Sequence, residues 1–191
     1  MPELKEFLHS ISPLSTASWN AVRALFKAAD LNAGDFFTQE GEFCKEFAFL
    51  NEGVVRAYCR SENGKEYNKH FFLSGSIIGG YTSLITNTPN QFIQQALTPC
   101  RIQIANYNAM VSLYDKHHDL ERIGRLFAER YFVEKEQKEV EIILHDAEQR
   151  YSTFQNQYPD LEQLIPQYHI ASYLGVTPTQ LSRIRRKRMG K

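Results

Sequence analysis

The sequence lacks long hydrophobic runs. Its most apolar stretches, such as Phe71 to Leu73 and Ile77 to Ile78, are far shorter than the roughly 20 residues needed to span a membrane. The first residues, Met1 to Phe7, include two glutamates and a lysine with no apolar run behind them, which does not fit a secretory signal. These absences indicate a cytoplasmic protein without a membrane partner.

Cysteine is also scarce. Cys44, Cys59 and Cys100 are widely spaced, with no CxxC pair and no histidine at zinc-ligand spacing, which favours reduced and mostly buried thiols. Only His70 of the six histidines lies in the strand-rich region, so a metal-binding jelly roll lacks donors. No Ser-His-Asp or phosphate-loop motif is present. The sequence therefore indicates no metal site, no cofactor and no enzyme.

The formal net charge is zero only for the chain as a whole. The 191 residues include 22 Lys+Arg and 22 Asp+Glu. Residues 179–191 contain six basic side chains and no acidic one, so the formal charge is −6 over residues 1–178 and +6 after them. An acidic body with a basic C-terminus confines the electrostatic attraction for nucleic acid to one end of the chain.

Glycine and proline are missing from residues 125–158, whereas seven of the ten glycines fall between residues 34 and 80. The glycine-rich part favours short strands of a sandwich or jelly roll, because Asn63-Gly64 is typical of a tight hairpin turn. The glycine-free part favours helix. A leading helix is also predicted over Thr16 to Ala29, capped by Ser15 or Thr16, with its apolar face on the sheet.

An apolar stripe marks the first part of the helical region: Leu120, Ile123, Phe127 and Tyr131. Such a stripe fits either a core helix or a helix that pairs with its copy, and we expect these four residues to form a dimer interface. A second stripe, from Val133 to Ala147, is out of register with the first. We therefore expect a bend or break near residues 132–136.

The C-terminal segment has the pattern of a helix-turn-helix. Pro166 can open a first helix, Gly175 can close it in the left-handed conformation, and Thr177 can cap a second helix. Pro178 then lies in the first turn, where its missing N–H costs nothing. The small core between the two helices is predicted from their apolar residues: Ile170, Ala171, Leu174, Val176, Leu181 and Ile184.

The second of these helices leaves short polar and basic side chains free for DNA. Arg can bind both acceptors of guanine and Gln can bridge adenine, so we expect Thr179, Gln180 and Arg183 to read bases. The later basic residues are expected to contact mainly phosphates. The complete predicted DNA-binding set is Thr177, Thr179, Gln180, Ser182, Arg183, Arg185, Arg186, Lys187 and Arg188.

The order of these patterns from Asp30 to Arg186 resembles the Crp/Fnr group of bacterial transcription regulators. The similar motifs include Leu31-Asn-Ala-Gly-Asp35, Gly75-Ser-Ile-Ile-Gly79 and Ile170-Ala-Ser-Tyr-Leu-Gly-Val-Thr-Pro-Thr-Gln-Leu-Ser-Arg-Ile184. The resemblance implies an α+β fold: an N-terminal cyclic nucleotide-binding-like jelly roll (double-stranded β-helix), a long dimerisation helix and a C-terminal helix-turn-helix. We expect the boundaries 1–106, 107–132 and 133–191. The implied partners are double-stranded DNA with a pseudo-palindromic operator, a second copy of the chain and RNA polymerase.

Two departures from the family pattern affect function. Members that bind cyclic AMP have a Glu and an Arg-Ser pair after the glycine matched by Gly79, whereas here Gly80 follows. Residues 61–100 contain no Arg and residues 67–114 no acidic residue, so a buried phosphate would depend on backbone N–H groups and Lys69. We therefore expect no response to cyclic AMP. In addition, the chain ends soon after the second helix, so we expect a winged-helix-like unit whose wing is truncated.

Alternatives remain for the jelly roll. The regulator could bind a cyclic nucleotide or another small effector through non-standard contacts, or it could have no effector. The candidate effector pocket comprises Phe71, Gly79, Gly80, Tyr81 and Phe92. Aromatic side chains, Phe72 among them, could instead fill it.

Overall fold

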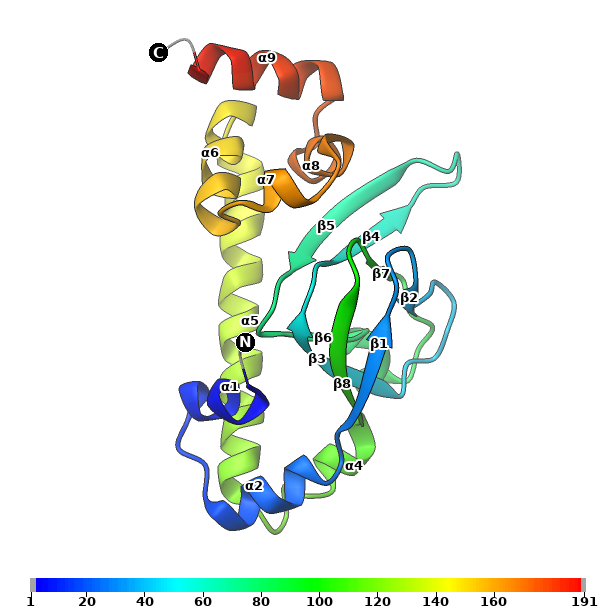
Figure 1. Cartoon of the computed structure of the whole chain (residues 1–191), viewed down its shortest axis with the longest axis vertical. Helices are drawn as coiled ribbons and strands as arrows, with labels where there is room; N and C mark the ends of the chain where they lie inside the picture. The colour runs from blue at the N-terminus through cyan, green and yellow to red at the C-terminus, as the bar shows by residue number, and fades with distance from the viewer. Residues whose placement is uncertain (1–2, 190–191) are drawn as a thin grey trace.

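The structure is a computed structural model, and it describes residues 3–189. Figure 1 shows a long helix, α5 (His118–Leu144), with the strands on one side, short N-terminal helices near its lower end and the C-terminal helices at its upper end. No helix in this range is long and apolar enough to cross a membrane. The expected truncation of the wing concerns residues after Met189, which lie outside the described range.

Two antiparallel four-stranded sheets form the jelly-roll-like part of the fold. The first has the order β1 (Lys27–Leu31), β8 (Cys100–Asn106), β3 (Glu46–Glu52) and β6 (Ser76–Ile78). The second has the order β2 (Phe36–Thr38), β7 (Ile93–Ala96), β4 (Val55–Arg60) and β5 (Glu66–Phe72). Buried side chains fill the space between the sheets: Leu50, Val55, Ile78, Ala96 and Ile102. The predicted short strands and the turn at Gly64, with φ +79°, are confirmed.

The N-terminal helices are shorter than predicted. Residues Leu4–Ile11 form α1, which was not predicted, and Thr16–Arg23 form α2. Ser15 caps α2 by accepting the N–H of Ser18 at 3.2 Å, as expected. The predicted continuation of this helix to Ala29 is wrong, because residues 27–31 pair with β8 and a full ladder of interstrand hydrogen bonds outweighs local helix propensity.

Helix α5 is continuous over 27 residues, so the expected break near residues 132–136 is wrong. The region has neither Gly nor Pro to break it. The first stripe packs on α1 and the sheets, whereas Val133, Val140, Ile143 and Leu144 of the second stripe lie on another, exposed face of α5. Ala147, the last residue of that stripe, belongs to α6 and packs in the C-terminal core. The helix also crosses the expected boundary between residues 132 and 133. Two short helices precede it, α3 (Tyr81–Thr86) and α4 (Tyr107–Val111).

The C-terminal helices share a core with the second sheet. They are α6 (Ala147–Gln157), α7 (Leu161–Leu164), α8 (Gln167–Leu174) and α9 (Pro178–Met189). The predicted apolar contacts between α8 and α9 are confirmed, since Ile170, Leu174, Leu181 and Ile184 are buried in one cluster. The same cluster includes Val54 and Phe71 from the β-sheet part. The C-terminal helices therefore pack directly against the sheet, and their link to it is more than the connecting chain.

Candidate functional site

The turn between α8 and α9 is fixed by local hydrogen bonds. Gly175 adopts the predicted left-handed conformation, with φ +69°, and its N–H donates to Ser172 O at 3.2 Å. Thr177 Oγ1 accepts the N–H of Gln180 at 3.2 Å, and Gln180 Oε1 accepts the N–H of Thr177 at 2.9 Å. This reciprocal capping starts α9 at Pro178, where the sequence predicts its first turn.

One face of α9 is exposed, whereas the opposite face is buried. Leu181 and Ile184 are buried, and the opposite side exposes Thr179, Arg183 and Arg186, which follow one another at steps of four and three. Ser182 is exposed beside them. Within residues 3–189, no carboxylate lies within ion-pair distance of Arg183 or Arg186. These side chains can therefore reach a ligand without first losing an internal partner.

Other residues of the predicted DNA-binding set already have partners in the chain. Lys187 Nζ lies 2.5 Å from Glu148 Oε1, and Arg185 Nε lies 3.7 Å from Glu162 Oε1. Arg188 Nη1 donates to Gln155 Oε1 at 3.0 Å. The side-chain oxygen of Gln180 is occupied in the cap. These contacts hold α9 against α6 and α7, a role that a run of basic residues in the sequence did not indicate.

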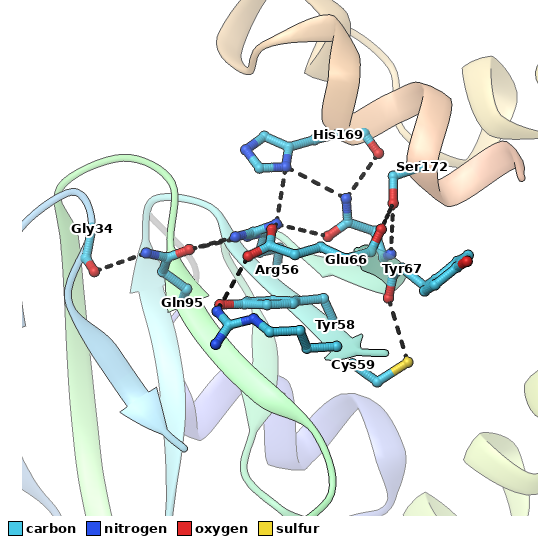
Figure 2. Close-up of polar contacts among 11 residues, drawn as sticks. Gly34, Arg56, Tyr58, Cys59, Glu66, Tyr67, Gln95, His169 and Ser172 are labelled. Carbon is cyan, nitrogen blue, oxygen red and sulfur yellow. Dashed lines mark hydrogen bonds and ion pairs between the residues drawn. The ribbon is translucent and has the colours of Figure 1, made fainter. Parts of the chain in front are cut away.

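A buried arginine joins the strands of the second sheet (Figure 2). Arg56 of β4 is 5% exposed, and its Nη1 donates to Glu66 Oε2 at 2.7 Å and to Asn68 Oδ1 at 3.3 Å. Its Nη2 donates to Gln95 Oε1 at 2.7 Å. The guanidinium carbon lies 3.7 Å from the ring centroid of Tyr58. Planar stacking and several charge-assisted hydrogen bonds together compensate the burial of this charge.

Helix α8 completes this network from above the sheet edge, as Figure 2 shows. His169 Nδ1 lies 3.1 Å from Arg56 Nη1, and Asn68 Nδ2 donates to the His169 carbonyl at 3.0 Å. The Ser172 hydroxyl accepts the N–H of Asn68 at 3.0 Å and donates to the carbonyl of Glu66 at 2.8 Å. Because β5 is an edge strand, its outer backbone groups need such partners. We call this the α8–sheet network: Arg56, Glu66, Asn68, Gln95, His169 and Ser172.

The network predicts a loss of stability in mild acid. Burial, followed by the positive charge of Arg56, lowers the pKa of His169 to about 4, so the unfolded chain binds more protons between pH 6.5 and pH 4. This contribution to stability is complete above pH 6.5 and is lost as the pH falls toward 4. Between pH 7 and pH 5 we expect a loss of about 2 kcal/mol from this residue, measured by urea unfolding at each pH.

Two variants isolate that contribution. His169→Gln is expected to have a flatter pH dependence than the wild type, whereas His118→Gln, changed at an exposed histidine with a side chain 84% accessible, is expected to match the wild type. The burial of His70 also lowers its pKa to about 4, so part of the acid sensitivity remains in His169→Gln. An unchanged pH profile in His169→Gln would contradict the assignment.

A cavity of about 730 Å³ is lined by residues of both sheets and of α1, α3, α4 and α5. Of the predicted effector-pocket residues, Gly79, Gly80, Tyr81 and Phe92 line it. Phe71 does not, and its assignment is wrong: its ring lies 5.4 Å from that of Tyr173, on the side of the C-terminal helices. Consecutive strand residues point to opposite faces, so the neighbouring Phe72 lines the cavity instead.

The predicted dimer stripe on α5 faces inward. Leu120 and Ile123 are 0% and 2% exposed within a single chain, and Phe127 and Tyr131 line the cavity. The chain's own elements cover Leu120 and Ile123, which leaves these two side chains no surface for a second copy, whereas Phe127 and Tyr131 are only half-buried. The exposed apolar side chains of α5 form a different stripe, which we call the outer α5 stripe: Phe132, Val133, Val140, Ile143 and Leu144.

Comparisons with known proteins agree with this architecture. Residues 29–117 match the model of the cyclic nucleotide-binding domain. No curated protein matches the chain. No three His, Cys, Asp or Glu side chains within residues 3–189 gather in a way that could hold a metal ion.

Several solved structures share the fold at low sequence identity. The c-di-GMP-responsive global regulator CLP of Xanthomonas campestris has 15% identity and a TM-score of 0.69, covering 92% of each chain. FixK2 of Bradyrhizobium japonicum has 15% identity and a TM-score of 0.73, covering 85% of this chain and 83% of that one. A Crp/Fnr-family transcriptional regulator of Eubacterium rectale has 16% identity and a TM-score of 0.69, covering 93% and 87%. The chain therefore has the fold of Crp/Fnr-type transcriptional regulators, with a cyclic nucleotide-binding domain.

Proposed function

We propose that the protein is a homodimeric DNA-binding transcriptional regulator in which α8 and α9 form the helix-turn-helix. The observation that supports this most directly is the free face of α9, where Thr179, Arg183 and Arg186 are exposed opposite the buried Leu181 and Ile184. A helix held by one side and presenting Thr and Arg on the other fits the major groove. The fold shared with FixK2 and with the Eubacterium rectale regulator supports a regulator rather than an enzyme.

The structure refines the expected roles of the basic residues. Among residues 3–189, Arg183 and Arg186 have neither an ion pair nor a side-chain hydrogen bond, whereas Arg185 is paired with Glu162 and Arg188 donates to Gln155. We therefore assign Arg183 to base reading. Arg185, Lys187 and Arg188 would contact phosphates only by exchanging their contacts to α6 and α7. Gln180 and Thr177 mainly position the helix N-terminus, although the Gln180 amide nitrogen remains able to donate to a base.

Arg183→Ala tests base reading. After an operator has been selected from a random DNA pool, we expect this variant to lose about 1 to 3 kcal/mol of discrimination at one base-pair position. Lys187→Ala is the matched comparison and is expected to weaken binding to all sequences alike, with a salt slope smaller by about one. Binding is measured by fluorescence anisotropy over a salt series. Equal weakening on every sequence by Arg183→Ala would refute its assignment.

We further propose that the outer α5 stripe pairs with its copy in a second chain. Phe132, Val140, Ile143 and Leu144 lie on one side of the helix at helical spacing and are more than half exposed. Exposing an apolar stripe of this kind to water is unfavourable. The stripe fits a pair of parallel helices packed side by side. Two copies joined in this way would present two α9 helices to a pseudo-palindromic operator.

Ile143→Glu is expected to convert the dimer to a monomer and to weaken operator binding by more than about tenfold, because a carboxylate would be buried in an apolar interface. Ile142→Glu is the matched control: Ile142 is 59% exposed against 77% for Ile143, but it lies on another side of α5. It should leave the dimer intact. Light scattering gives the mass, and a dimeric Ile143→Glu variant would contradict the proposed interface.

We infer that cyclic AMP is not the effector. Residues 61–100 supply no Arg, and Arg125 of α5, which also lines the cavity, is paired with Glu129 at 2.6 Å. A cyclic phosphate would have no free guanidinium to compensate its desolvation. The alternative, in which a cyclic nucleotide binds through non-standard contacts, requires saturating cyclic AMP to raise the melting temperature by several degrees.

A further inference from the structure

A β-bulge in strand β5 turns Lys69 toward the cavity. In the pairing of β4 with β5, Ala57 is opposite His70 and Tyr58 is opposite Asn68, so Lys69 is the extra residue without a partner in the register. Bulges re-aim side chains, and they are frequent next to binding sites. Here Lys69 lines the cavity, with its Nζ 3.9 Å from the ring centroid of Phe92.

Lys69 has a cation–π contact with Phe92 but no ion-pair partner among residues 3–189. Within the described part of the chain, no carboxylate lies within 4.0 Å of its ammonium group. Burial, followed by the charge of Lys135 on α5, lowers the pKa of Lys69. Lys135 lines the same cavity. Glu121 also lines it, but its position on α5 is about 20 Å from that of Lys135 along the helix. Two ammonium groups at one end of a cavity favour a bound anion.

The rest of the lining is aromatic and carries hydroxyl groups. The lining includes the rings of Phe72, Tyr81, Phe92, Tyr107, Tyr114 and Tyr131, and further rings come from α1, β3 and α5. Gly124 of α5 leaves room for one of them, because a Cβ at that position would lie 2.6 Å from the Tyr114 hydroxyl. Such walls favour a planar apolar body, and the volume of about 730 Å³ is in the range of small-molecule sites.

Gln94 supplies a further polar feature. Its side chain is 4% exposed and lines the cavity, and its Nε2 donates to the Gly79 carbonyl at 3.1 Å. Its Oε1 is buried and has no hydrogen-bond partner among residues 3–189. The amide cannot be flipped without losing the Gly79 contact, so the free oxygen is an acceptor. Because this oxygen has almost no accessible surface, a ligand N–H or O–H group could satisfy it only after the Gln94 side chain shifts toward the cavity.

We propose that this cavity binds a small aromatic carboxylic acid, with the carboxylate at Lys69 and Lys135, the ring among the aromatic side chains and a donor group available to Gln94. A carboxylate fits better than a cyclic phosphodiester with sugar hydroxyls, because the site offers ammonium groups and rings but no free guanidinium. As the effector of the proposed regulator, such an acid would act through α5, which contributes Lys135. The binding step itself does not depend on DNA binding.

The experiment compares indole-3-acetate with its neutral analogue indole-3-acetamide on the 191-residue chain, by isothermal titration and thermal shift. We expect the acid to bind and to raise the melting temperature, and the amide to bind about tenfold more weakly or worse. Lys69→Met should bind the acid no better than the wild type binds the amide. The matched control Lys65→Met, changed on the exposed hairpin of the same strand, should bind the acid like the wild type.

Equal binding of the acid and the amide, failure of the acid to bind at millimolar concentration, or undiminished acid binding by Lys69→Met would each overturn the proposal. If Lys69→Met does not fold, Lys135→Gln replaces it with the same expected weakening, because its side chain lies on the exposed helix surface at the cavity rim. DNA binding is measured separately. Arg183→Ala should retain acid binding, so a failure of the ligand site and a failure of the proposed function are distinguishable.

Discussion

Arg56→Ala is expected to destabilise the protein by about 3 to 5 kcal/mol. The substitution removes a 5%-exposed guanidinium and leaves Asn68 Oδ1 and Gln95 Oε1 without their donor. His169 Nδ1 keeps only its 3.4 Å contact with Asn68 Nδ2. Buried polar groups that lose a partner cost their full desolvation energy. Since His169 belongs to α8, the loss also weakens the attachment of the C-terminal helices. Urea unfolding followed by circular dichroism measures the change in free energy.

Arg60→Ala is the matched control for this variant. Arg60 lies on the same strand and also contacts Glu66, at 3.4 Å, but its side chain is 46% exposed. Exposed ion pairs contribute about 0 to 1 kcal/mol, so we expect a small effect. Similar losses from the two variants would show that burial and the contact with α8 do not set the energy of Arg56. Arg56→Lys should recover little, because an ammonium group cannot make the same set of contacts.

Phe154→Ala is expected to cost about 3 to 5 kcal/mol as well. Phe154 of α6 is fully buried, and its ring centroid lies 6.2 Å from that of Phe71, 5.3 Å from that of Tyr158 and 5.6 Å from that of Tyr173. These rings come from the sheet and from the C-terminal helices, so the cavity left by truncation lies between the two parts. Limited proteolysis after α5 should therefore accelerate together with the loss of stability.

The control for Phe154→Ala removes the same ring from the surface. Phe43 is 54% exposed, and Phe43→Ala is expected to change the free energy of unfolding by less than about 1 kcal/mol. If Phe154→Ala were equally mild, the aromatic cluster would not be what holds the C-terminal helices to the sheet. A selective rise in proteolysis without global destabilisation would also contradict the shared core.

The parts of the fold that were predictable are those that depend on local chemistry. Pro166, Gly175 and Thr177 set the ends of α8 and α9 through backbone conformation and capping, which act within a few residues. The hairpin at Gly64 follows for the same reason. The reciprocal cap between Thr177 and Gln180 was also visible as a spacing of three, although the sequence interpretation assigned Gln180 to base reading.

The parts that were missed depend on contacts between distant segments. Residues 27–29 continue a helical pattern, yet β8, more than 70 residues later, recruits them into a strand. The spacing of apolar residues on α5 also does not tell whether they contact their own chain or a second copy. The packing of α1 against the first part of α5 decides it. The α8–sheet network forms no recognisable sequence motif, because its members are common polar residues up to 113 positions apart in the chain.

Because α5 is one uninterrupted helix, a small tilt at one end produces a larger displacement at the other. Its 27 residues extend over about 40 Å, from the level of α2 and α4 to the level of the C-terminal helices in Figure 1. A tilt of only about 5 degrees at one end would move the other by about 3.5 Å, close to the rise of one DNA base pair. The α8–sheet network and the aromatic cluster hold α9 to the sheet of the same chain. In the proposed dimer, a change in the spacing of the two α9 helices would therefore require whole chains to pivot rather than a hinge within one chain.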